Sequence, residues 1–251
     1  MICSNVIPLH LACRNKNEKA FIVKKILDKL KENSKKINYL EAALKKEDNS
    51  RQTIYLIAIE NNHLNIVEYL LRDFKVNKEQ KDGQNGNMAI HFCAKTGSVE
   101  MFHLLQKYDA VSFKTNNNQE NALHIAAYNN KHKFIKEFLL YEKCLLEKQD
   151  SENYMPCICK CDDYHTLSIR QRDHNNYTPL LTALAASNQR CVEELLNDSN
   201  IELDAKDISG NSIFHICSEF DNGESLKFLF QHYSTDIIYS KNNLEESVLH
   251  R

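Results

Sequence analysis

The chain has 251 residues, of which 42% are hydrophobic, and its 32 basic side chains are nearly balanced by 34 acidic ones for a net charge of −2. A chain so close to neutral has no general attraction for nucleic acid or for an anionic membrane. No run approaches the roughly 20 apolar residues of a membrane-spanning helix. The opening residues Met1 to Asn5 also lack the basic and apolar stretches of a signal peptide. We therefore expect no membrane span and a cytoplasmic location.

One short phrase recurs along the whole chain. Its fullest copy runs from Asn121 to Ala127: a small polar residue, a small residue, Leu-His, an apolar residue and two alanines. The histidine column of the phrase falls at positions 10, 56, 91, 124, 181, 215 and 250, so successive copies are 46, 35, 33, 57, 34 and 35 residues apart. Leucine replaces histidine in two of these copies, and five keep it: His10, His91, His124, His215 and His250.

Each copy is followed by the same series of patterns. About ten residues on lies an apolar stripe with helical spacing, such as Phe134, Ile135, Phe138 and Leu139. Turn-forming residues lie between the two patterns, and Asn-, Asp- and Gly-rich connections precede each new copy. The sequence therefore predicts units of helix, tight turn, helix and polar connection, near residues 6–30, 50–81, 82–115, 116–149, 150–172, 173–206, 207–241 and 242–251.

The phrase resembles the T-P-L-H-x-A signature of ankyrin repeats, whose period is about 33 residues. In the copy beginning Thr178-Pro179, threonine caps the free N–H groups of a helix and proline suits its first turn. The resemblance implies an all-α ankyrin-repeat solenoid over residues 1–251, with β-hairpin fingers formed by the polar connections. Because neither end carries a polar capping repeat, we expect a solenoid that is truncated at both ends.

Two intervals exceed the period. The first excess lies around residues 31–48, where helical spacing predicts an extended second helix or an additional short one. The second lies between His124 and Leu181, where residues 150–172 are either a decayed repeat that has lost a helix or a loop insertion. We favour the decayed repeat, because Ile158 falls 34 residues after His124, in register with the phrase.

Most of the nine cysteines fit the repeat pattern as small core residues, as Cys93, Cys191 and Cys217 do. A separate cluster, Cys157, Cys159 and Cys161, has a spacing of one residue and no second pair, which argues against structural zinc. Inert, partly buried thiols are the favoured interpretation of this cluster. A thiol sensor activated by the neighbouring Lys160 is the alternative.

The repeated histidines are also interpreted as structural. In ankyrin repeats this histidine bridges the loops of adjacent repeats by hydrogen bonds. One imidazole per repeat places neighbours roughly 10 Å apart, too far for joint ligation of a metal ion. No catalytic motif or phosphate-binding loop is present, so we expect no enzyme activity, no cofactor and no metal site.

Lysines gather in the N-terminal part of the chain, among them Lys24, Lys25 and Lys29. A solvated helix face is the favoured interpretation. A patch that binds a phosphoinositide or an acidic partner is the alternative.

The predicted function is recognition of a protein partner through the concave face and the fingers of the solenoid. Six fingertip residues are expected to be exposed: Gln84, Asn85, Asn118, Gln119, Asn175 and Asn176. A narrower resemblance, carried by residues 177–221 and by the phrase at Asn87 to Gly97, is to the cytoplasmic ankyrin array of ankyrin-type transient receptor potential channels. It implies part of a homotetrameric cation channel that senses temperature or electrophiles. The alternatives are a soluble ankyrin-repeat adaptor and a giant ankyrin-rich cytoskeletal protein.

Overall fold

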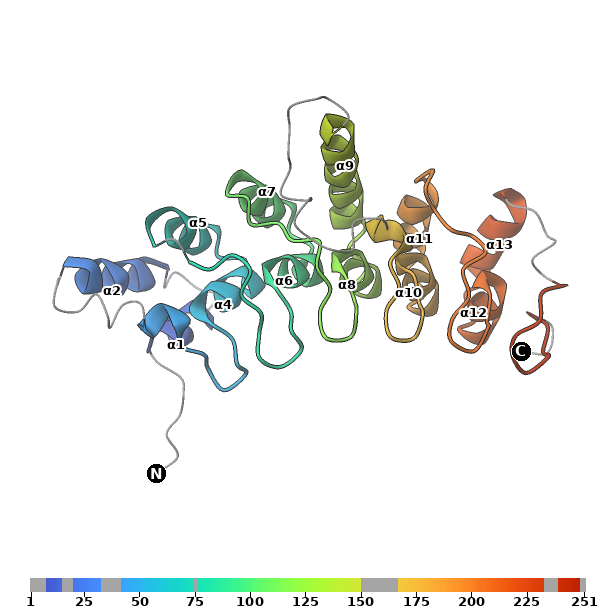
Figure 1. Cartoon of the computed structure of the whole chain (residues 1–251), viewed down its shortest axis with the longest axis horizontal. Coiled ribbons are helices and arrows are strands. Elements are labelled where there is room, and N and C mark those ends of the chain that lie inside the picture. The colour runs from blue at the N-terminus through green and yellow to red at the C-terminus, as the bar shows by residue number, and fades with distance from the viewer. Residues whose placement is uncertain are drawn as a thin grey trace. The chain divides into compact units, whose positions relative to one another are not determined.

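A computed structural model describes residues 8–14, 20–32, 42–74, 76–149, 167–232 and 239–248. The chain divides into two compact units, unit 1 up to Ser112 and unit 2 from Phe113 onward (Figure 1). The described residues form helices joined by turns, and their one β feature is an isolated antiparallel bridge between Lys241 and Ser247. The all-α prediction is confirmed.

Unit 1 is built from pairs of antiparallel helices. The pairs are α1 (Pro8–Arg14) with α2 (Ala20–Glu32), α4 (Ile54–Glu60) with α5 (Leu64–Asp73), and α6 (Ala89–Thr96) with α7 (Val99–Lys107). The first helices α1, α4 and α6 pack side by side in that order, and α2, α5 and α7 form a second layer behind them (Figure 1).

Unit 2 repeats this plan. Its pairs are α8 (Ala122–Tyr128) with α9 (His132–Gln149), α10 (Pro179–Ala185) with α11 (Gln189–Leu196), and α12 (Ile213–Glu219) with α13 (Gly223–His232). Helix α10 packs against both α8 and α12, while α11 packs against both α9 and α13.

The first helices are short because both of their ends are set by the sequence. At the start of α10 the Thr178 hydroxyl accepts the N–H of Leu181 at 3.4 Å, and Pro179 occupies the first turn. At the end, Ser187 has a φ of 53°, a left-handed conformation that breaks the helix and reverses the chain. Asn62, Gly97, Asn130 and Asp221 have the same role in other repeats, with φ between 49° and 75°.

The core lies between and within the two layers. Leu123, Leu180 and Phe214 occupy equivalent places in α8, α10 and α12, and all three are fully buried. Burying each such side chain stabilises the fold by about 1.5–3 kcal/mol. The apolar residues of one helix pair are covered by the next pair, so the repeats of a unit depend on each other for stability.

The two long intervals differ in what they contain. In the first, α2 ends at Glu32 and residues 42–45 form a separate helical turn, which is the second of the two predicted alternatives. In the second, the described part is residues 167–172, with the 3₁₀ turn η3 (Ser168–Arg170) packed against α10. The buried carboxylate of Glu142 on α9 holds this turn by accepting the N–H and the hydroxyl of Ser168 at 3.0 and 2.6 Å. The prediction of a decayed repeat falls mainly on residues 150–166, outside the described residues.

Candidate protein-interaction surface

The polar connections between repeats share one local geometry. In the connection 207–211 the side chain of Asp207 accepts the N–H groups of Ser209 and Asn211 at 2.9 and 2.8 Å. The N–H of Asp207 in turn donates to the carbonyl of Asn211 at 3.1 Å. The same pair of side-chain bonds and the same closing bond are made at four other connections by Asp48, Asn116, Asp173 and Asn242. The connection 82–87 is one residue longer, and there the side chain of Asp82 accepts the N–H groups of Asn85 and Asn87.

Each connection also needs one residue with a left-handed backbone. This residue precedes the closing position and has a φ between 53° and 76° in Arg51, Gly86, Gln119, Asn176, Gly210 and Glu245. With its N–H groups satisfied by an Asp or Asn side chain, each connection is a self-contained turn. The predicted hairpin fingers are therefore present in the described residues as tight turns closed by a backbone hydrogen bond, without strands beyond the isolated bridge between Lys241 and Ser247.

Neighbouring fingers of unit 2 are joined to one another by backbone hydrogen bonds. The N–H of His174 donates to Asn118 at 3.1 Å, that of Ile208 to Asn175 at 3.0 Å, and that of Asn243 to Ser209 at 3.0 Å. These bonds arrange residues 116–120, 173–177, 207–211 and 242–246 in order, and we call this set the finger ladder. Finger 116–120 is thus bonded directly to finger 173–177, although equivalent residues of the two fingers, such as Asn117 and His174, are 57 positions apart in the sequence.

The predicted fingertip residues divide into two groups. In unit 1 Gln84 and Asn85 are exposed, and in the finger ladder Asn118, Gln119 and Asn175 are exposed. Asn176 is half-buried, because its amide donates to the carbonyl of Lys206 at 2.7 Å.

Two apolar residues of the ladder were not predicted as site residues. The side chains of Ile208 and Leu244 lie on consecutive fingers, and these residues are 68% and 70% exposed. An isoleucine or leucine inside a turn-forming segment is the sequence signal that would have identified them. Around them the ladder presents mainly side-chain amides, because Asp173 and Asp207 are used inside their own turns. The most exposed charge of the ladder is Glu245, whose side chain is 81% exposed beside Leu244 and accepts from Lys241 at 2.9 Å.

The repeat histidines position the fingers from below. His124 and His215 are at most 1% exposed, and their Nε2–H groups donate to the carbonyls of Tyr177 and Glu246 at 2.8 and 3.1 Å. Each accepting carbonyl is that of the last residue of the next finger. In unit 1, Nε2–H of His10 donates instead to the carbonyl of Lys46 at 2.9 Å, two residues before the next finger begins at Asp48.

The second ring nitrogen of these histidines is also used. Nδ1 accepts the N–H of the residue that begins the helix, at 3.1 Å in His91 and 3.3 Å in both His124 and His215. One nitrogen of His124 donates and the other accepts, so this ring is neutral. In agreement, burial lowers the pKa of His10 and of His124. His250 lies outside the described residues.

The remaining predicted sites carry no chemistry in the described part of the chain. Burial raises the pKa of the Cys191 and Cys217 thiols to about 12, so both are protonated at neutral pH. Cys157, Cys159 and Cys161 lie outside the described residues. Among those that are described, no group of histidine, cysteine or carboxylate side chains is arranged to hold a metal ion. The structure likewise contains, over the same residues, no helix that is long and apolar enough to cross a bilayer.

Stacked helix pairs with hydrogen-bonded fingers define a helical repeat protein. The sequence profile of the ankyrin repeats, which spans three copies of the repeat, matches residues 3–82 and again 73–150. The chain therefore belongs to the ankyrin-repeat family.

The fold is similar to that in the crystal structure of the ankyrin repeat domain of Bcl-3, described as a unique member of the IkappaB protein family. The TM-score is 0.66 at 19% sequence identity, over 98% of this chain and 93% of that one. At this identity the likeness shows the fold alone. No curated protein matches the chain.

Family membership supports the general prediction of a protein-binding and generally non-catalytic domain. Neither match supports the narrower resemblance to ankyrin-type transient receptor potential channels.

Proposed function

We propose that this chain is a protein-binding module that holds its partner on the finger ladder of unit 2. The observation that carries the proposal is the pair of exposed apolar side chains, Ile208 and Leu244, on two consecutive fingers joined by a backbone hydrogen bond. Their exposure has no role in the fold, because neither side chain contributes to the buried core.

The ladder has the physical properties of a binding surface. Its turns are fixed by side-chain and backbone hydrogen bonds, so binding loses little backbone entropy. Apolar anchors surrounded by hydrogen-bonding amides match the usual arrangement of an apolar interface centre and a polar rim. We infer a partner segment with apolar side chains to cover Ile208 and Leu244 and with neutral polar groups to meet Asn118 and Asn175.

Site-specific photo-crosslinking tests this proposal. A photoactivatable amino acid replaces Ile208 or Leu244 in the full chain, and as a matched control it replaces Leu140, which is 50% exposed on α9. The chain is then irradiated in cells, and crosslinked proteins are identified by mass spectrometry. We expect the same protein at positions 208 and 244 and its absence at position 140. Equal yields at all three positions, or different proteins at 208 and 244, would contradict the proposal.

The channel hypothesis is the finer alternative, and it rests only on the sequence phrases at 87–97 and 177–221. A free-standing adaptor agrees better with the matches, since both describe ankyrin repeats and neither describes a channel. The coding sequence beyond Arg251 separates the two. Six apolar segments of about 20 residues would establish the channel, whereas a stop codon after a capping repeat would establish the adaptor.

A further inference from the structure

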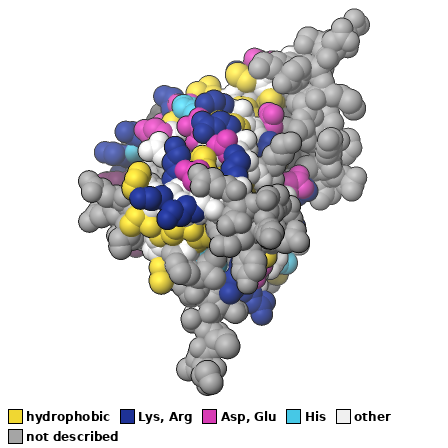
Figure 2. All heavy atoms as spheres, turned by 90° about the vertical axis from the view of Figure 1, so that its left-hand side faces the viewer, with side chains coloured by type: hydrophobic (Ala, Val, Ile, Leu, Met, Phe, Trp, Pro, Cys, Tyr) yellow, Lys and Arg dark blue, Asp and Glu magenta, His cyan; other side chains and the backbone are white. Residues whose placement is uncertain are grey.

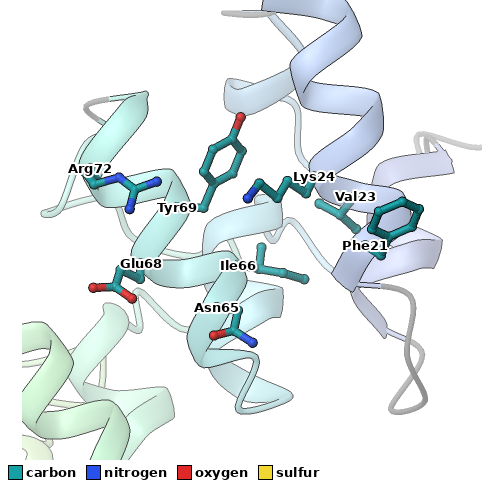
Figure 3. A pocket seen from close by; sticks show the side chains of 8 residues that line it. All are labelled: Phe21, Val23, Lys24, Asn65, Ile66, Glu68, Tyr69 and Arg72. Atoms are coloured by element: carbon teal, nitrogen blue, oxygen red, sulfur yellow. The ribbon is translucent and has the colours of Figure 1, made fainter.

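A groove in unit 1 lies away from the fingers, between the second helices α2 and α5. Its volume is about 360 Å³, enough for one or two side chains of a ligand and at the lower end of the range of small-molecule sites. Figure 3 shows the side chains that form it: Phe21, Val23 and Lys24 from α2, and Asn65, Ile66, Glu68, Tyr69 and Arg72 from α5.

The floor of the groove is apolar. Val23 is fully buried, Ile66 is 3% exposed and Tyr69 is 8% exposed, while Phe21 forms an open wall at 68% exposure. The hydroxyl of Tyr69 donates to Asp28, which fixes the ring across the groove. A leucine or phenylalanine side chain of a ligand would meet hydrocarbon on three sides here.

The rim of the groove is basic. Helix α2 carries four lysines against Asp28 and Glu32. On the face of unit 1 in Figure 2, Lys and Arg side chains lie among acidic and apolar ones. Lys24 points across the groove with its Nζ 5.4 Å from the centre of the Tyr69 ring (Figure 3). Nζ of Lys25 lies 5.6 Å from the centre of the Phe21 ring. Both cations therefore lie over aromatic surface that a ligand would also contact.

The acidic groups near the groove already have partners. Asp28 accepts the Tyr69 hydroxyl, Asp73 accepts Arg72 at 2.8 Å, and Glu68 accepts Lys107 at 2.8 Å. Among the described residues, no carboxylate forms a salt bridge with Lys24, Lys25 or Lys29. Lys24, Lys25 and Lys29 on α2 are thus available to a ligand, whereas Lys31 lies 4.0 Å from Asp73, and the carboxylates of Glu68 and Asp73 on α5 are paired with cations.

From this arrangement we infer that the α2–α5 groove binds a short acidic peptide segment of a partner protein. An apolar side chain of the segment enters between Phe21 and Ile66, and flanking carboxylates pair with Lys24 and Lys25. A peptide fits better than a membrane surface, because the apolar floor is recessed between two helices and a flat surface would not reach it. The inference concerns unit 1 and is independent of the partner proposed for the finger ladder.

The test uses the full chain and an array of twelve-residue peptides, each with one leucine or phenylalanine flanked by two to four carboxylates. Peptides of equal charge with serine in place of the apolar residue are the peptide controls. Binding of the best peptide is then measured by fluorescence anisotropy. The variant K24Q/K25Q is compared with K45Q/K81Q, which removes the same charge from two other exposed lysines of unit 1.

We expect saturable binding that falls about fivefold to tenfold in K24Q/K25Q and less than about twofold in K45Q/K81Q. The salt dependence should weaken only in the first variant. Phe21→Ser should reduce affinity without changing the salt dependence, because it removes apolar contact and no charge. All these positions are exposed on the surface, so circular dichroism should show unchanged folding.

Three results would overturn the inference. The first is the absence of saturable binding across the array. The second is an equal loss of affinity in the two lysine variants. The third is binding to vesicles of anionic phospholipid that K24Q/K25Q weakens while no peptide competes, which would assign the basic rim to a lipid surface.

Discussion

His124 provides a quantitative test of how the fingers are held. Replacing it by alanine removes the bond to the Tyr177 carbonyl at 2.8 Å and the bond from the Asn121 N–H at 3.3 Å. The Asn121 N–H left without a partner costs about 1–3 kcal/mol, and the Tyr177 carbonyl, which keeps the closing bond from the Asp173 N–H, loses about 0.5–1.5 kcal/mol. The lost side-chain packing adds to this. We expect His124→Ala to lower the free energy of unfolding by about 3 kcal/mol, near the middle of the range that these two losses give together.

His174→Ala is the matched control. The Nε2–H of His174 also donates to a finger carbonyl, that of Asn117, at the same 2.8 Å, but this bond is exposed. Water replaces an exposed bond, so the expected loss is below about 1 kcal/mol. The unfolding of both variants in urea is followed by circular dichroism. The slope of the unfolding free energy against urea concentration is compared between them, because a changed slope would show a departure from two-state unfolding, which occurs in repeat proteins. Losses for the two variants that agree within about 0.5 kcal/mol would refute the reasoning.

The pH dependence of stability follows from the same site. The pKa of His124 in the folded chain is lowered from its ordinary value of 6.5, and so is that of His10. Below about pH 6.5 the unfolded chain therefore binds protons that the folded chain does not, and stability falls. The slope is at most about 1.4 kcal/mol per pH unit for each histidine, and His124→Ala should reduce it. An unchanged slope in the variant would contradict this assignment.

Two further predictions concern a finger glycine and the buried thiols. Gly210→Ala should lower stability by about 1–3 kcal/mol, because its φ is 76° and an added Cβ would lie 2.4 Å from a side-chain oxygen of the next finger. An added Cβ at Gly223 would have no atom within 4 Å, so Gly223→Ala should leave stability unchanged or raise it. Equal changes in the unfolding free energy of the two variants in urea would be evidence against the contact between fingers at Gly210. Brief alkylation followed by peptide mass spectrometry should modify the exposed Cys144 and leave Cys217 intact until the chain unfolds, so early labelling of Cys217 would disagree with its burial.

The sequence predicts the helices and turns well because their signals are local. The phrase beginning Thr178-Pro179 contains its own cap and first turn, and Ser187-Asn188 contains the reversal. The fingers were located for the same reason. Their internal bonds were not predicted, since only the structure shows that the side chain of an Asp or Asn such as Asp207 accepts the N–H groups of its own finger.

The binding surface was harder to predict because it depends on residues that are distant in sequence. The bond from His174 to Asn118 joins two fingers whose repeats are 57 residues apart in the sequence. The residues around either finger give no sign of this bond. The exposure of Ile208 and Leu244 likewise depends on how neighbouring fingers lie against each other. From their hydrophobic side chains alone, both residues would be expected in the core. Asn176 shows the reverse, since a polar fingertip is partly covered by its contact with Lys206.

The most direct test of the proposed function is the affinity of the partner captured at positions 208 and 244. Isothermal titration with the purified partner compares the wild-type chain with Ile208→Asp, Leu244→Asp and the control Leu140→Asp. An aspartate at a buried apolar contact should weaken binding at least about tenfold, and we predict this loss for the two finger variants alone. Unchanged affinity in both finger variants, or an equal loss in Leu140→Asp, would show that the partner does not bind the finger ladder.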